Sequence, residues 1–135
     1  METKETEKVL RELLSFCVLP PGKRFQAVEQ IAKIQALPAR KCAARLIERV
    51  GEYCTFRIID TECALEPAAE DRLEELYALT VLMLQSREDL WSQESIEGVG
   101  EWSLLSRAAS EAMRSLRWEA SDTIDAEALA DLLAE

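Results

Sequence analysis

The nine residues Leu76–Leu84, which read LYALTVLML, form the longest apolar run in the chain, and Thr80 is the one polar residue in it. They end a stretch that begins at Glu66-Pro67, and proline is well tolerated in the first turn of a helix. The first turns carry a group of acids that suits the positive end of a helix dipole: Glu70, Asp71, Glu74 and Glu75. A helix that is apolar on all sides is normally buried. We therefore expect a helix over 67–85 at the centre of a helical bundle.

The composition favours one mainly helical domain. A chain of 135 residues with 48% hydrophobic and 31% charged residues is ordinary for a single globular domain. Four glycines and four prolines supply few of the turns that an all-β fold needs. We predict an all-α fold in which residues 1–135 form one bundle of five to six helices.

Hydrophobic periodicity and the positions of the prolines place the helices along the chain. We expect them at about 5–18, 23–36, 39–61, 67–85, 101–120 and 125–134, with a loop at 92–100. Short links at Pro20–Gly22 and Leu37-Pro38 favour antiparallel neighbours among the first three helices. Their layout resembles the hairpin array of an α-solenoid, although no residue pattern repeats.

The end of the third helix is ambiguous, because Tyr53–Ile59 has the β-branched and aromatic content of a strand. No second strand is evident for it to pair with, so we favour a helix through this stretch. Arg57 would then fall in the middle of the apolar face, which argues against a straight helix there, and Gly51 is a candidate for a bend.

No apolar run approaches the roughly 18 residues of a membrane span, so no membrane partner is expected. Residues Met1–Lys8 are charged and lack the apolar segment of a signal peptide. Both features predict a cytoplasmic protein.

The cysteines and the missing histidine disfavour metal and acid–base chemistry. The four cysteines form no CxxC pair and the chain has no histidine, so neither a metal nor another cofactor is expected. Cys17, Cys42 and Cys54 fall inside helical patterns, which predicts buried thiols rather than disulfides. Nucleotide-binding and nucleophile motifs are absent, so the chain is not expected to be an enzyme.

Charge divides the chain into two unequal parts. Residues 1–60 carry eleven Lys or Arg and eight Asp or Glu, whereas residues 61–135 carry five and eighteen. This asymmetry indicates oppositely charged surfaces and makes head-to-tail self-association into a homo-oligomer an open alternative.

A basic stripe is expected on the third helix, where Arg40 adjoins Lys41, Arg45 and Arg49. Such a stripe can bind an acidic protein surface, although acids at i+3 can also neutralise it within the helix. The net charge of −10 and the lack of interleaved aromatic residues disfavour nucleic acid as the partner.

A second candidate protein-binding surface lies near the end of the fifth predicted helix. Trp118 is expected opposite the buried face, on the same side as Arg107, Glu111 and Arg114. Tryptophan and arginine are enriched at binding hot spots. The alternative is that the last helix folds back and covers Trp118.

The third candidate is the LxxLL string on the last helix, formed by Leu129, Leu132 and Leu133. Short helices of this kind dock into apolar grooves on partner proteins. The alternative, which periodicity favours, is that these leucines pack on their own domain.

Together these features predict a non-catalytic protein–protein interaction module, such as an adaptor or an assembly subunit. One alternative is an acidic decoy that inhibits a nucleic-acid-binding protein by occupying its basic groove. Another is a small enzyme that uses carboxylates alone, which would need a deep pocket with two buried acids.

Overall fold

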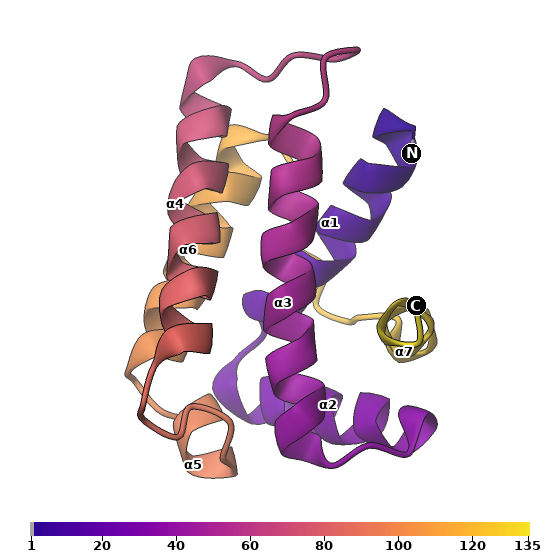
Figure 1. Cartoon of the computed structure of the whole chain (residues 1–135), viewed down its shortest axis with the longest axis vertical. Helices are drawn as coiled ribbons and strands as arrows, with labels where there is room; N and C mark the ends of the chain where they lie inside the picture. Colours follow the sequence, from indigo (N-terminus) through magenta and orange to yellow (C-terminus); the bar gives the residue numbers. More distant parts are fainter. Residues whose placement is uncertain (1) are drawn as a thin grey trace.

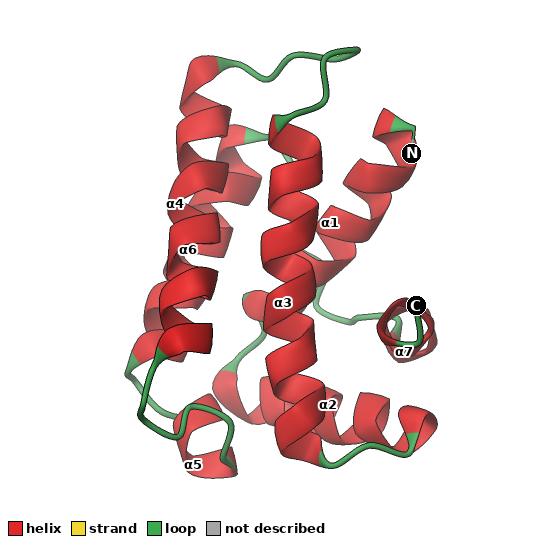
Figure 2. Ribbon diagram, viewed as in Figure 1, coloured by secondary structure: helices red, strands yellow, loops and turns green. Residues whose placement is uncertain are grey.

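Seven helices and no strand make up residues 2–135, the part of the chain that the computed structural model describes (Figure 2). The all-α prediction is confirmed. The helices are α1 (Thr3–Cys17), α2 (Pro21–Gln35), α3 (Ala39–Ile58), α4 (Pro67–Gln85), α5 (Gln93–Ile96), α6 (Glu101–Ser115) and α7 (Ala126–Leu133).

Local signals explain where the helix boundaries differ from those expected. The predicted loop at 92–100 contains the short helix α5, because the Ser92 hydroxyl accepts a hydrogen bond from the amide of Ser95 at 3.1 Å. The helix expected to reach residue 120 ends at Ser115. Arg117 there adopts a left-handed conformation, with φ of 61°, and the Trp118 amide donates to the Met113 carbonyl at 2.8 Å.

Four of the helices, α1, α3, α4 and α6, form a closed ring. α3 packs between α1 and α4, and α6 closes the ring by contacting both α4 and α1. In Figure 1, α2 crosses the foot of α3, and α7 is seen end-on beside α1 and α3. One continuous apolar core joins all of these elements. Because α2 runs across α3, the first three helices do not form the expected antiparallel hairpin array.

The expectation that 67–85 is the central helix is wrong. α4 buries Leu73, Leu76 and Met83, but Leu82 is 64% exposed and Tyr77 is 44% exposed. The ring gives α4 two neighbours, α3 and α6, so the rest of its surface faces outward. The central position belongs to α3, which contacts α1, α2, α4 and α7.

The stretch Tyr53–Ile59 is helical through Ile58, as we favoured. Arg57 does lie on the buried face, and its side chain is 4% exposed. Its Nε donates to the Glu7 carboxylate of α1 at 2.8 Å, and its Nη1 donates to the Cys63 carbonyl at 2.7 Å. A paired and hydrogen-bonded charge is tolerated in a core, so Arg57 is no argument against a regular helix.

The closest approach of α3 to α4 occurs at Gly51. A Cβ added to this residue would lie 2.7 Å from Oγ1 of Thr80, which is itself buried. The glycine therefore allows these two helices to approach closely. Gly51, which we considered as the position of a bend in the helix, instead affects how the helices pack.

A second buried arginine, Arg24, joins three elements at the foot of the bundle. It is 1% exposed, and its guanidinium donates to the Ile96 carbonyl at the end of α5 at 2.6 Å. Its Nη1 makes longer contacts with two carbonyls, at 3.4 Å with that of Cys17, the last residue of α1, and at 3.5 Å with that of Leu19. The guanidinium carbon lies 5.3 Å from the ring centroid of Trp102 in α6.

Within residues 2–135, none of the helices combines the length and the apolar character needed to cross a membrane.

Candidate functional site

The structure divides the predicted basic stripe. Arg40 pairs with Asp89 in the α4–α5 connection, and Arg49 pairs with Glu52 at 3.0 Å. Arg49 also donates to the carbonyls of Leu132 and Glu135 at 3.4 and 2.8 Å, so it holds α7 in place. Lys41 and Arg45 are exposed and form no ion pair with the described residues. The expected alternative, neutralisation by acids at i+3, is confirmed for Arg49, and binding of a protein by the stripe stays a prediction.

Trp118 is half-buried and packs at the edge of the core. α1 residues including Lys4, Arg11 and Ser15 line the hollow on one side of it, and Arg114 lines the hollow on the other. The expected alternative, that the last helix covers Trp118, is wrong, because α7 packs on α2 and α3.

The predicted cluster around Trp118 is only partly assembled. Arg114 lies beside Trp118, whereas Arg107 is exposed and lines neither hollow. Glu111 turns toward α4 and pairs with Arg72 at 3.0 Å. Of the predicted cluster only Arg114 lies beside the tryptophan, and the arginine on its other side is Arg11 of α1.

The LxxLL leucines pack inside the protein. Leu129 and Leu133 are 1% exposed and Leu132 is 7% exposed. The Gln35 side chain donates to the Ala130 carbonyl at 2.7 Å, which fixes α7 against α2. The prediction that these leucines dock into a partner is wrong, and their alternative, packing on the domain itself, is confirmed.

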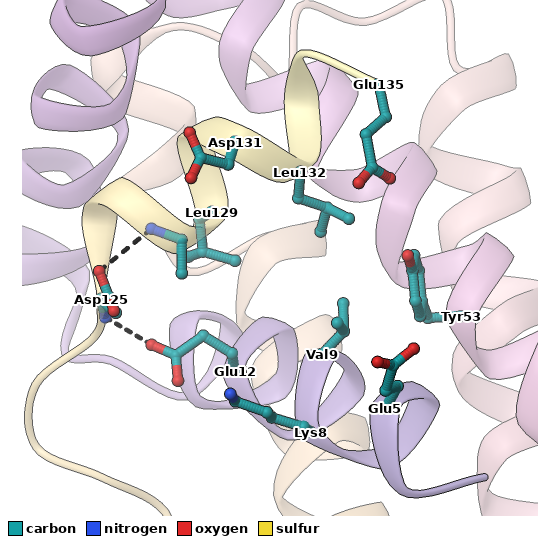
Figure 3. A pocket seen from close by; sticks show the side chains of 11 residues that line it. Glu5, Lys8, Val9, Glu12, Tyr53, Asp125, Leu129, Asp131, Leu132 and Glu135 are labelled. Carbon is teal, nitrogen blue, oxygen red and sulfur yellow. Dashed lines mark hydrogen bonds between the residues drawn. The ribbon is translucent and has the colours of Figure 1, made fainter. Parts of the chain in front are cut away.

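A groove of about 430 Å³ lies between α1 and α7, and we call it the α1/α7 groove (Figure 3). Its floor is apolar and is formed by Val9 of α1 and by Leu129 and Leu132 of α7, and Tyr53 of α3 forms part of the wall. Leu129 and Leu132, which were predicted to bind a partner protein directly, thus form part of the floor. α7 creates this groove by lying beside α1 without closing against it.

Acidic side chains surround the floor, and they come from both helices. Five carboxylates line the groove against one ammonium, that of Lys8; the acids are Glu5, Glu12, Asp125, Asp131 and Glu135. Asp125 also caps α7, because its side chain accepts from the Ala128 amide at 3.1 Å, and Glu12 accepts from the Asp125 amide. None of the five is in a side-chain ion pair with a described residue, so the groove keeps a negative field.

Tyr53 supplies a polar group at the wall of the groove. The residue is 4% exposed, yet its hydroxyl forms no hydrogen bond with any residue from 2 to 135. Figure 3 shows this hydroxyl on the side of Glu135. Burial is the main cause that raises the pKa of Tyr53, and the charge of Glu135 adds to it. The neutral hydroxyl is therefore a donor available to a ligand.

Little in the amino-acid sequence pointed to this site. Glu5, Val9 and Glu12 lie at helical spacing, but an amphipathic first helix with surface acids is ordinary. The other half of the groove comes from residues more than a hundred positions later, and only the packing of α7 brings them near. The missing information was where α7 docks.

Metal and thiol chemistry find no assembled site in the part of the chain that is described. No three His, Cys, Asp or Glu side chains among residues 2–135 are placed to hold a metal ion. Cys17, Cys42 and Cys54 are buried free thiols, as predicted, and Cys63 is exposed. Burial raises the pKa of Cys17 to about 12 and that of Cys42 to about 11.

One thiol of four is therefore expected to react in the folded protein. Only Cys63 offers an accessible sulfur, and the buried thiols stay protonated and shielded. A thiol-specific chromogenic reagent should label one cysteine per chain rapidly in buffer and four in denaturant. In Cys63→Ser the rapid phase should disappear, and a rapid phase that survives would contradict the burial of the other three.

Comparison with protein-family models, curated proteins and solved structures finds no match, so no relative supplies a function for these surfaces.

Proposed function

We propose that this protein is a non-catalytic protein-binding module whose α1/α7 groove takes a basic segment of a partner protein. One observation carries this function: five carboxylates from two helices surround an apolar floor. Such a module would serve as an adaptor or an assembly subunit. A reducing, cytoplasmic location suits a core that contains three free thiols.

The chemistry of the groove defines the segment that fits it. An apolar floor binds aliphatic side chains, and the acidic rim attracts Lys and Arg on either side of them. The Tyr53 hydroxyl adds one donor for a backbone carbonyl at the wall. A segment in which basic and aliphatic residues alternate meets all three requirements.

The shape of the acidic surface favours this function over the decoy. A decoy that enters a basic groove must present its carboxylates on a protruding surface, whereas those of the α1/α7 groove line a hollow. The carboxylate enzyme gains no support either, because no Asp or Glu among residues 2–135 is buried.

Binding can be tested with a fluorescently labelled peptide that alternates lysine and leucine, and with a matched peptide in which glutamate replaces lysine. Fluorescence anisotropy should report binding of the basic peptide alone, and the affinity should fall as salt is raised. Asp131→Lys should weaken binding about tenfold, because it places a positive charge on the rim. The control is Glu94→Lys, which makes the same charge change on exposed α5, outside the groove.

A second pair of variants tests the location without changing charge. Ala128 is exposed and lines the groove, so Ala128→Trp should fill the hollow and abolish binding. The matched control Ala68→Trp, at an exposed position near the start of α4, should bind normally. Equal binding of both peptides, or equal loss in Ala68→Trp and Ala128→Trp, would refute the proposed function.

A further inference from the structure

The outward surface of α3 and α4 carries a group of exposed apolar side chains, with Glu48 and Glu52 of α3 beside them, and no other element covers it. We call it the α3/α4 face, and its members are Phe56, Ile59, Tyr77, Val81 and Leu84. Ile59 is 66% exposed, and Phe56, Tyr77 and Leu84 are each about 40% exposed. Contiguous apolar side chains of this size on a surface mark an interaction site.

The α3/α4 face is hollowed along its centre. A shallow groove of about 340 Å³ runs between the two helices, with Gly51 and Thr80 at its base. The absence of a side chain at Gly51 lets the two backbones approach, so flanking side chains stand above a recess. A ridge of side chains from another helix can pack into such a recess.

Charge is distributed unevenly along this face. α3 and α4 run in opposite directions, so the N-terminal turns of α3 and the C-terminal end of α4 share one end of the face (Figure 1). That end carries the basic residues Lys41 and Arg45, which form no ion pair with a described residue, and Glu48 lies between them and the centre. The opposite end carries Glu70 and Glu74 from the first turns of α4.

The two ends lie at equal distances from the centre. Arg45 precedes Gly51 by six residues and Glu74 precedes Thr80 by six residues, which at about 1.5 Å per residue is about 9 Å in each case. Because the helices are antiparallel, Arg45 and Glu74 lie on opposite sides of the Gly51–Thr80 contact. If two copies were related by a two-fold axis through this contact, Arg45 of one copy would lie opposite Glu74 of the other.

We infer that the α3/α4 face binds a second copy of this chain in a two-fold symmetric dimer. In a two-fold interface each surface meets itself, so a face that is basic at one end and acidic at the other is self-complementary when reversed. The apolar residues would meet at the centre, with two Arg45–Glu74 pairs outside them. This arrangement accounts for both the open apolar side of α4 and the position of its acids.

The dimer is independent of the proposed function. No residue lines both the α1/α7 groove and the hollow of the α3/α4 face, although the rings of Tyr53 and Phe56, one from each surface, lie 5.2 Å apart. A dimer of this kind would carry two open α1/α7 grooves and would bind two basic segments, which raises the apparent affinity for a partner with two such segments.

Analytical ultracentrifugation of the full chain over a wide range of dilution tests the interface. We expect the wild type to sediment as a dimer that dissociates on dilution. Leu84→Glu and Tyr77→Glu should each give a monomer, since each places a charge at the apolar centre. The control Leu104→Glu changes an equally large, 51% exposed side chain on α6, outside the face, and should remain dimeric.

A charge exchange distinguishes the two-fold arrangement from any other association. Arg45→Glu and Glu74→Arg should each weaken the dimer about tenfold, because each brings like charges together. The double variant should regain wild-type affinity, since the pairs form again with their signs reversed. Both positions are exposed, and circular dichroism will show that the variants remain folded. A wild type that is monomeric at high concentration, a double variant weaker than both single ones, or a Leu104→Glu monomer would each overturn the inference.

Discussion

Replacing Arg24 with alanine should lower the free energy of unfolding by about 3–5 kcal/mol, the largest effect that we expect from a single substitution in this chain. The side chain is fully enclosed, so truncation leaves a cavity beside Trp102. It also removes the donor that satisfies the Ile96 carbonyl at 2.6 Å. Urea unfolding followed by circular dichroism will measure the loss.

The environment of Arg24 explains why this position is sensitive. No carboxylate of residues 2–135 pairs with the guanidinium, its Nε has no hydrogen-bond partner, and burial lowers the pKa of Arg24. The charge is held by carbonyls at the ends of α1 and α5, where helix dipoles are negative, and by the ring of Trp102. Arg24 thus joins α1, α5 and α6 to α2.

Two further variants separate the parts of this effect. Arg24→Met keeps most of the volume and loses the hydrogen bonds, so it should cost about half as much as alanine. Arg24→Lys keeps the charge but lacks the planar guanidinium that lies near the Trp102 ring and donates to several carbonyls. Its loss of stability should fall between those of Arg24→Met and Arg24→Ala. A loss below about 1 kcal/mol in Arg24→Ala would show that the buried cation contributes nothing net to stability.

Gly51→Ala should destabilise the protein by about 2 kcal/mol, even though alanine is the better helix former. The added methyl group would lie 2.7 Å from Thr80 Oγ1, so α4 must shift or Thr80 must rotate out of its hydrogen bond to the Tyr77 carbonyl. Thermal and urea unfolding of the purified variant will measure the effect.

The same crossing offers a rescue and a control. Thr80→Ala removes the obstructing atom, so Gly51→Ala combined with Thr80→Ala should be more stable than the sum of the two single effects predicts. Gly22→Ala is the control, because its added methyl group would meet only the end of the Glu97 side chain at 3.9 Å. If Gly22→Ala cost as much as Gly51→Ala, the loss could not be due to helix approach.

The elements were predictable from the sequence because each has a local cause. Prolines sit at the starts of α2 and α4, and apolar residues recur at helical spacing through α1, α3 and α6. The termination of α6 was missed because its left-handed cap is an arginine rather than the usual glycine. Arg57 was misinterpreted because a buried ion pair with Glu7 cannot be recognised before α1 and α3 are known to meet.

The surfaces were less predictable than the helices, since each depends on contacts between distant segments. The sequence showed that the later part of α4, Leu76–Leu84, is apolar all round, but not that a ring of four helices would leave one side open. The pairing of Arg49 with Glu52 could be expected from their spacing, but its contacts with the carbonyls of Leu132 and Glu135 could not, because they depend on where α7 packs. Of the residues predicted to bind protein, Arg40, Lys41, Arg45, Arg107 and Arg114 remain exposed, and the three leucines serve as floor or core.

The α1/α7 groove exists only while α7 is packed on the bundle, so it depends on the equilibrium between the packed and the detached state of this helix. This eight-residue helix is held by the Gln35 and Arg49 side chains and by its buried leucines, and it is joined to α6 by residues 116–125. Segments of this kind open without global unfolding, and their amide hydrogens exchange with solvent faster than those of the bundle. A ligand bound between α1 and α7 would stabilise the docked helix by mass action. Slower deuterium uptake confined to α7 would then record occupancy of the groove, even for a partner too weak to isolate.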